Sequence, residues 1–198
     1  MIDTKFRDPL VWKRFGIHHL SPNSINSFLC YRSKWILEKG FKYDFSPNLL
    51  MVRGTCVEQA GSLFAEQRPN NIEKVIEYAQ NLYDAKIQRK DENDYILPQS
   101  DEEKEFRKTI PPMIDKVVDL VQKSGDYKGT HKKIVISLSE LFGDEDLPNM
   151  IGYTDYNFIY DRFPLTVDIK APRNKSKKMN YGYWLQGMFY YQGQDYDC

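Results

Sequence analysis

Cysteine is scarce in this chain of 198 residues: it has three, far apart, and no CxxC pair. A zinc ribbon therefore cannot be read, and a disulfide framework is not expected in a chain of this size. A four-cysteine iron–sulfur cluster cannot be completed from within the chain, so no iron–sulfur cluster is expected. This cysteine usage favours a reducing, cytoplasmic compartment.

Long apolar runs and net charge are also lacking. No stretch reaches the ~20 apolar residues that a membrane span needs, and the charged start of the chain, broken by Pro9, lacks the apolar core of a signal peptide. We therefore expect no membrane partner. The 28 basic and 28 acidic residues give a formal net charge of zero. That balance excludes a uniformly basic nucleic-acid coat but leaves room for a local basic patch.

What the chain does have is a change of hydrophobic period along its length. Helical spacing predicts helices over about 22–40, 50–67, 72–89 and 101–123, the last with a bend at Pro111 and Pro112. Strand-like patterns follow at 134–138, 150–160 and 165–171, with a tight turn at 161–164 and a final helix over 181–192. We predict an α+β fold in one domain over 1–198. Its helical part covers about 20–124, and a β-meander plus helix forms a core over about 130–192.

The strand-like region contains an unusual set of charged residues. Asp155 stands inside one predicted strand, and Asp168 and Lys170 stand two apart in the next, so that these two share a face. A hairpin would place Asp155 beside them. Two carboxylates can hold Mg²⁺ or Mn²⁺, which activates water, and a nearby lysine can position that water or stabilise the transition state. The pattern favours phosphodiester hydrolysis over the commoner alternative, a solvated strand face.

A basic cluster comes directly after these residues. It consists of Lys170, Arg173, Lys175, Lys177 and Lys178. Such side chains can neutralise the phosphates of a nucleic-acid backbone. The alternative is an ordinary solvated loop. The position of the basic cluster next to the acidic residues favours nucleic-acid binding.

Taken in chain order, these motifs resemble the PD-(D/E)XK nuclease superfamily, in its branch of RecB-like and lambda-type phage exonucleases. GYTD at 152–155 is similar to the second motif of that family, and VDIK at 167–170 is similar to its (D/E)-X-K motif. QGMFY at 186–190 resembles the Q-X-X-X-Y motif of RecB-like members. RGTCVE at 53–58 resembles the first motif, and the stretch 20–32 resembles the opening helix.

The resemblance implies a restriction-endonuclease-like core, a mixed β-sheet flanked by helices. It implies that Glu58, Asp155 and Asp168 bind Mg²⁺ or Mn²⁺ together with the backbone carbonyl of Ile169, and that Lys170 is the catalytic lysine. The first motif departs from many RecB-like relatives, which have histidine where this chain has Glu58. Glutamate at this position is closer to the lambda-type exonucleases.

The resemblance also implies residues that meet the substrate. Gln186 and Tyr190, four apart on a helix, share a face and would contact nucleic acid or support Lys170. Arg32 on the opening helix would contact phosphate, although an ordinary exposed helix face is an equal alternative for it. From the basic cluster described above, Arg173, Lys175 and Lys177 are the expected phosphate contacts.

The expected function is a metal-dependent DNA exonuclease in recombination, repair or phage DNA processing, in the cytoplasm of a bacterial or phage-infected cell. Its partner would be linear DNA, including DNA with single-stranded ends, and the family analogy allows a homo-oligomer or a recombination partner protein. Three alternatives stay open at this point. They are an endonuclease of the same superfamily, a non-catalytic nucleic-acid-binding module on this fold, and a helical interaction protein.

Overall fold

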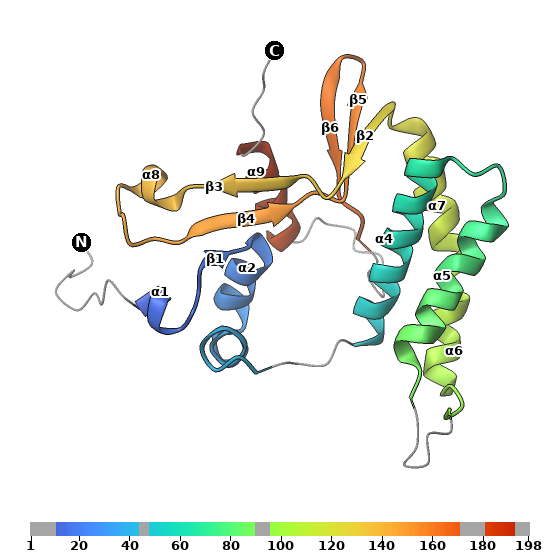
Figure 1. Ribbon diagram of the computed structural model, residues 1–198, viewed down its shortest axis with the longest axis horizontal. Coiled ribbons are helices and arrows are strands. Elements are labelled where there is room, and N and C mark those ends of the chain that lie inside the picture. Colours follow the sequence, from blue (N-terminus) through green and yellow to red (C-terminus); the bar gives the residue numbers. More distant parts are fainter. Residues whose placement is uncertain (1–10, 44–47, 90–95, 171–180, 193–198) are drawn as a thin grey trace. The chain divides into compact units, whose positions relative to one another are not determined.

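The computed structural model describes residues 11–43, 48–89, 96–170 and 181–192. Over these residues the fold is of the α+β type, and the strands form two three-stranded sheets (Figure 1). In chain order the elements are α1 (Val11–Arg14), β1 (His19–Leu20), α2 (Pro22–Cys30), α3 (Arg32–Trp35), the π-helical turn η2 (Ile36–Gly40), α4 (Leu49–Gln67), α5 (Ile72–Ile87), α6 (Asp101–Lys108), α7 (Ile110–Lys123), β2 (Asp126–Thr130), β3 (Lys133–Ile136), α8 (Leu138–Phe142), β4 (Asn149–Tyr153), β5 (Tyr156–Tyr160), β6 (Phe163–Val167) and α9 (Tyr181–Gln192).

The chain divides into two compact units that alternate along the sequence. The first unit comprises 1–45, 133–153 and 176–198, and the second comprises 46–132 and 154–175. The chain passes from one unit to the other twice in the β-rich region, between Lys132 and Lys133 and between Tyr153 and Thr154. The prediction of one nuclease domain over 1–198 is not decided by this division and stays a prediction.

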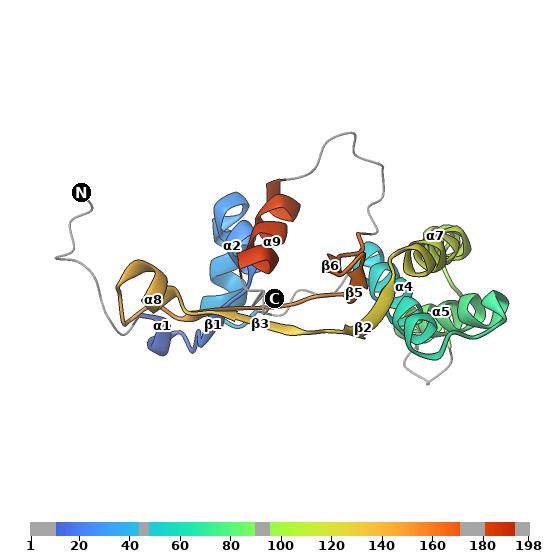
Figure 2. The same cartoon turned by 90° about the horizontal axis from the view of Figure 1, so that it is seen from above.

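The first unit is built on the sheet β1-β4-β3, in which β1 runs parallel and β3 antiparallel to β4. Helices α2 and α9 lie side by side on one face of this sheet (Figure 2). Ser21 caps the N-terminus of α2, because its side chain accepts a hydrogen bond from the Ser24 N–H at 3.0 Å. Gly152 of β4 allows α9 to pack closely, since a Cβ at this position would overlap the Phe189 ring.

The second unit is built around α4, which packs against α5, α7 and β2. The buried residues of α4 include Val52, Cys56, Val57, Ala60 and Phe64, which recur at helical spacing. They face a core completed by apolar residues of α5 and α7. The antiparallel sheet β2-β5-β6 closes this unit, with Tyr156 and Phe158 of β5 pointing into the same core.

The predicted strand over 150–160 is wrong in one respect: it is two strands, β4 and β5, in two different sheets. The chain changes sheet at Thr154, which is fully buried. The Thr154 N–H donates to the Lys132 carbonyl at 3.1 Å, and the Thr154 carbonyl accepts from the His131 N–H at 2.9 Å. These two bonds hold the crossing and leave Asp155 between strands, not inside one.

Two predicted helices are also interrupted, and some short elements were not predicted. The first predicted helix breaks at Tyr31, and the helix over 101–123 breaks at Thr109. Pro111 and Pro112 do not bend a helix, because they lie in the first turn of α7, where a missing N–H costs nothing. The unpredicted elements are α1, β1, β2 and α8. The helices over about 50–67, 72–89 and 181–192 are confirmed as α4, α5 and α9.

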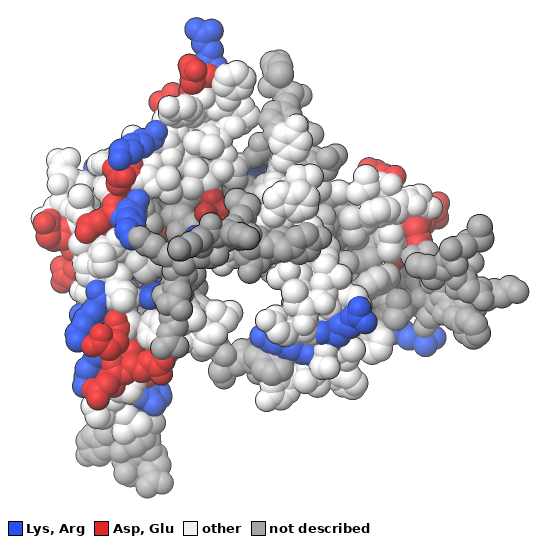
Figure 3. Space-filling view, turned by 180° about the vertical axis from the view of Figure 1, so that it is seen from behind, with Lys and Arg blue, Asp and Glu red and all other residues white. Residues whose placement is uncertain are grey.

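Surface charges of the two signs are mixed. Figure 3 shows basic and acidic side chains interspersed on one face, most densely near α6, where Lys104 pairs with Asp101 and Lys108 with Glu105. Exposed pairs of this kind contribute little to stability. In the described segments, no helix combines the length and the apolar character that crossing a membrane requires.

Candidate active site

The predicted acidic residues come together within the second unit. Glu58 extends from α4, Asp155 stands just before β5, and Asp168 and Lys170 follow β6. The hairpin between β5 and β6 is confirmed, with Tyr156 opposite Val167 at its open end. The strand predicted over 165–171 ends earlier, at Val167, so Asp168 and Lys170 lie beyond the strand. Their position at the end of β6 nevertheless brings them beside Asp155.

Two short contacts define this acidic group. The Ile169 N–H donates a hydrogen bond to Asp155 Oδ2 at 2.6 Å, which ties the start of β5 to the segment after β6. The Lys170 ammonium group forms an ion pair with Asp168 Oδ2, and both side chains are largely buried, 30% and 19% exposed. The prediction that Asp155 lies beside the Asp-X-Lys pair is therefore confirmed.

The electrostatics of Asp155 are unusual. Burial, followed by the negative charge of Asp168, raises the pKa of Asp155 from 3.8 to about 7, and the Glu58 charge contributes less. The Ile169 N–H and the Lys170 charge oppose this rise but do not cancel it. Burial and the negative charge of Asp168 therefore disfavour the ionised form of Asp155, and a bound cation would stabilise that form.

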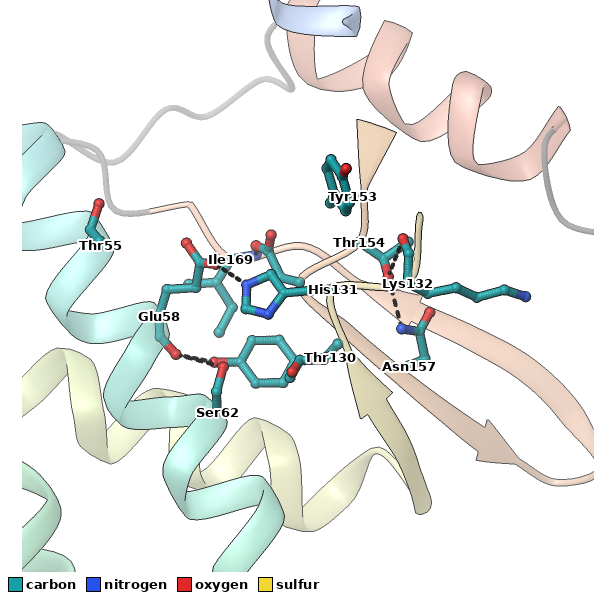
Figure 4. A network of polar contacts seen from close by, with 12 residues as sticks. Thr55, Glu58, Ser62, Thr130, His131, Lys132, Tyr153, Thr154, Asn157 and Ile169 are labelled. Atoms are coloured by element: carbon teal, nitrogen blue, oxygen red, sulfur yellow. Dashed lines mark hydrogen bonds and ion pairs between the residues drawn. The ribbon is translucent and has the colours of Figure 1, made fainter. Parts of the chain in front are cut away.

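Glu58 has a partner that the sequence did not indicate. His131 Nε2 lies 3.0 Å from Glu58 Oε1 and donates a hydrogen bond to it when that nitrogen carries a proton. Figure 4 shows the Glu58 side chain reaching from α4 toward the His131 ring. His131 follows β2 with a φ of 54°, and its backbone bonds to Thr154. No motif or spacing could have identified this residue, because the contact joins positions 73 apart.

The backbone of this region is held by Tyr156, which is fully buried. Its hydroxyl donates to the Glu58 carbonyl at 2.8 Å, so the residue after Asp155 is tied to the helical turn that carries Glu58. Gly61 makes this contact possible, because a Cβ at Gly61 would overlap the Tyr156 hydroxyl and a Val117 methyl group. The sequence signal for this close contact was a glycine inside an apolar helical pattern, which often has a packing reason.

We expect Gly61→Ala to destabilise the protein by about 1–3 kcal/mol, as overpacking does. Helix propensity alone predicts the opposite, a gain of up to about 1 kcal/mol, so the sign of the change tests the packing at Gly61. Urea unfolding followed by far-UV circular dichroism measures it. Gln59→Ala, at an exposed position of the same helix, is the matched control. A stabilised Gly61→Ala protein would contradict the close approach of Tyr156.

The remaining predicted residues are placed differently. Gln186 and Tyr190 share a face of α9 as predicted, and the Gln186 side-chain amide donates to the Tyr190 hydroxyl at 2.6 Å. That hydroxyl in turn donates to the Tyr153 carbonyl at 2.6 Å. Both side chains are buried in the first unit, which favours a supporting role at the end of β4 over direct contact with nucleic acid. Arg32 is exposed in the same unit, while Arg173, Lys175 and Lys177 lie outside the described residues.

The donor set has the chemistry of a site for a hard divalent cation. Within the described residues, no three His, Cys, Asp or Glu side chains are already arranged so that they could hold a metal ion together. The two carboxylates of Asp155 and Asp168, however, are oxygen ligands of the kind that Mg²⁺ and Mn²⁺ prefer, and a cation would relieve their mutual repulsion. Glu58 is near enough for its charge to raise the pKa of Asp155, but one of its carboxylate oxygens contacts His131.

Comparison with protein-family models, with curated proteins and with solved structures finds no match for this chain.

Proposed function

We propose that this protein is a divalent-metal-dependent DNA nuclease of the PD-(D/E)XK type, acting as an exonuclease. One observation carries the proposal: Asp155, Asp168 and Lys170 converge at one end of the β5–β6 hairpin. There the Asp155 carboxylate has a pKa raised to about 7 by burial and by its acidic neighbours. Catalytic sites typically contain a carboxyl group whose pKa is strongly shifted by burial and by a nearby charge.

Each residue has a defined part in this proposal. Asp155 and Asp168, with the Ile169 carbonyl, would hold Mg²⁺ or Mn²⁺, and Glu58 would complete the set. A bound metal would supply an activated water and stabilise charge on the phosphate. Lys170 places a cation beside Asp168, where it can orient the water or balance the charge that develops on the phosphate oxygens.

A non-catalytic binding module explains the same residues less well. Burying two carboxylates side by side costs stability. Negative charges also do not strengthen the binding of a polyanion such as DNA. A cation-dependent reaction uses both carboxylates. A purely helical interaction protein has no use for the group at all.

The wider setting is also part of the proposal. The mixed α+β fold would be a variant of the restriction-endonuclease-like core. The cellular role would lie in DNA recombination, repair or phage DNA processing, in the cytoplasm of a bacterial or phage-infected cell. A homo-oligomer or a recombination partner is compatible with this role.

The test is cleavage of end-labelled linear DNA and of covalently closed circular DNA, each with Mg²⁺, Mn²⁺ or EDTA. We expect metal-dependent shortening of linear DNA only, abolished by EDTA and reduced by at least about a hundredfold in Asp168→Asn. Asp161→Asn, in the exposed turn between β5 and β6, is the matched control. Nicking of closed circles would establish the endonuclease alternative. No cleavage by the folded protein under any metal would exclude a nuclease.

A further inference from the structure

The second unit contains a cavity next to the proposed site, with a volume of about 530 Å³. It lies between α4, α7 and the segment 168–170. Val57 and Val117, both almost fully buried, contribute to its apolar lining, and Met113 and Leu120 extend that lining toward solvent. The apolar side chains of α4 and α7 therefore leave a hollow next to charged residues instead of closing over it.

Positive charge predominates around this cavity. Arg53, Lys116 and Lys170 line it, against one carboxylate, Asp168. Arg53 is 4% exposed, and its position is fixed by a hydrogen bond to Thr109 Oγ1 at 2.9 Å. Its guanidinium group also lies 5.1 Å from the centre of the Phe106 ring. Lys116, by contrast, is exposed on α7. The cavity thus combines apolar walls with one fixed cation and two more accessible ones.

A ligand that fits this lining must have a flat apolar part and an anionic part, and a nucleotide has both. Bases bind apolar and aromatic side chains through their faces with little regard to sequence, and lysines bind the phosphates. Cavities of roughly 300–1,000 Å³ hold small molecules, so one nucleotide can enter this cavity. A base can enter only when it has no pairing partner, since a base pair carries a second strand with it.

We propose that this cavity binds the unpaired terminal nucleotide of a DNA strand. Its base would lie against Met113 and Leu120, and its phosphate would face Lys116 and Lys170. The proposal rests on the proposed function, because Asp168 and Lys170 line the cavity and also belong to the cleavage site. It adds a substrate class that the carboxylates alone do not define: single-stranded ends are bound in preference to paired ones.

Binding can be measured without cleavage. The probes are a fluorescein-labelled oligothymidylate and a blunt-ended hairpin duplex, titrated in EDTA and followed by fluorescence anisotropy. The variants are Lys116→Ala and Leu120→Ser, and Lys123→Ala is the matched control. Lys123 lies on the same helix, is exposed and pairs with Asp119, outside the cavity. Circular dichroism verifies that each variant folds.

We expect the wild type to bind the oligothymidylate more tightly than the duplex. Leu120→Ser should weaken oligothymidylate binding about fivefold, the lower end of what loss of a base contact costs, without affecting duplex binding. Lys116→Ala should weaken it about three- to tenfold and reduce the slope of log affinity against log salt by about 0.7, because one phosphate contact is lost. Lys123→Ala should change neither value.

Failure of this inference and failure of the nuclease proposal give different results. Unchanged oligothymidylate binding in both cavity variants, or equal binding of duplex and single strand, would overturn the cavity assignment even if the protein cleaves DNA. Selective single-strand binding that depends on Lys116 and Leu120 would support the assignment even if no metal produces cleavage.

Discussion

Replacing Lys170 with methionine is expected to slow DNA cleavage by about a hundredfold to ten-thousandfold. The ammonium group is paired with Asp168 and is 30% exposed, so it stands at the acidic group while remaining accessible to a substrate. Positioned charges and acid–base groups contribute factors of this size. Methionine keeps most of the length and apolar volume of the lysine stem and removes only the charge. The measurement is the single-turnover cleavage rate on linear DNA at saturating Mn²⁺.

Controls separate a role in chemistry from simple neutralisation of Asp168. Lys128→Met removes an exposed lysine on β2 of the same unit and should cleave at the wild-type rate. Lys170→Arg keeps the charge but changes its geometry. If Lys170 acts on the water or the phosphate, arginine should restore little activity. Mn²⁺ affinity, measured by calorimetry, should not fall in either Lys170 variant. Full activity in Lys170→Met would remove this residue from the site.

The sequence allowed much of this site to be predicted because its main residues interrupt hydrophobic runs. Asp155 and Asp168 each follow a stretch rich in β-branched and aromatic residues, and the turn at 161–164 indicated that the two stretches pair. The structure confirms the pairing, from Tyr160 with Phe163 to Tyr156 with Val167. Local alternation and a tight turn determine a hairpin, so no distant information was needed.

The parts that could not be predicted depend on contacts between distant positions. The division of 150–160 into two strands follows from bonds between Thr154 and residues 131 and 132, which no local pattern records. The contact of His131 with Glu58 and the cavity beside Lys116 arise in the same way, from elements brought together by packing. The restriction-endonuclease-like core stays a prediction, as do the metal and the roles of the site residues.

The raised pKa of Asp155 predicts how stability depends on pH. In the unfolded chain this carboxyl loses its proton near pH 4, whereas in the folded protein its pKa is about 7. Between these values the folded state retains a proton that unfolding releases, so the Asp155 contribution to stability falls as pH rises from about 4 to 7. The slope from one group is at most about 1.4 kcal/mol per pH unit. Above pH 7 this contribution no longer changes.

Asp155→Asn isolates that contribution and is expected to have opposite effects on stability and on activity. The asparagine oxygen can still accept the Ile169 N–H, but the buried negative charge is gone. Without metal, the variant should be as stable as the wild type near pH 4 and more stable by up to about 4 kcal/mol at pH 8, which is the full difference between the two pKa values. Cleavage should fall by at least about a hundredfold, because a metal ligand is lost. Stability is followed by far-UV circular dichroism, to which α4, α5, α6 and α7 of the second unit contribute. Tryptophan fluorescence would not report on that unit directly, because Trp12, Trp35 and Trp184 all belong to the first.

Divalent metal should cancel this pH dependence in the wild type. A cation binds the ionised carboxylate, so below about pH 7 it must displace a proton, and its apparent affinity should fall about tenfold per pH unit. Saturating Mg²⁺ or Mn²⁺ should therefore stabilise the wild type more at pH 8 than at pH 6, because ligands stabilise the state they bind. The Asp155→Asn protein should gain little at either pH. Equal stabilisation of both proteins by metal would place the cation elsewhere. Equal stability of both proteins at pH 8 without metal would show that Asp155 does not carry a buried, repelled charge.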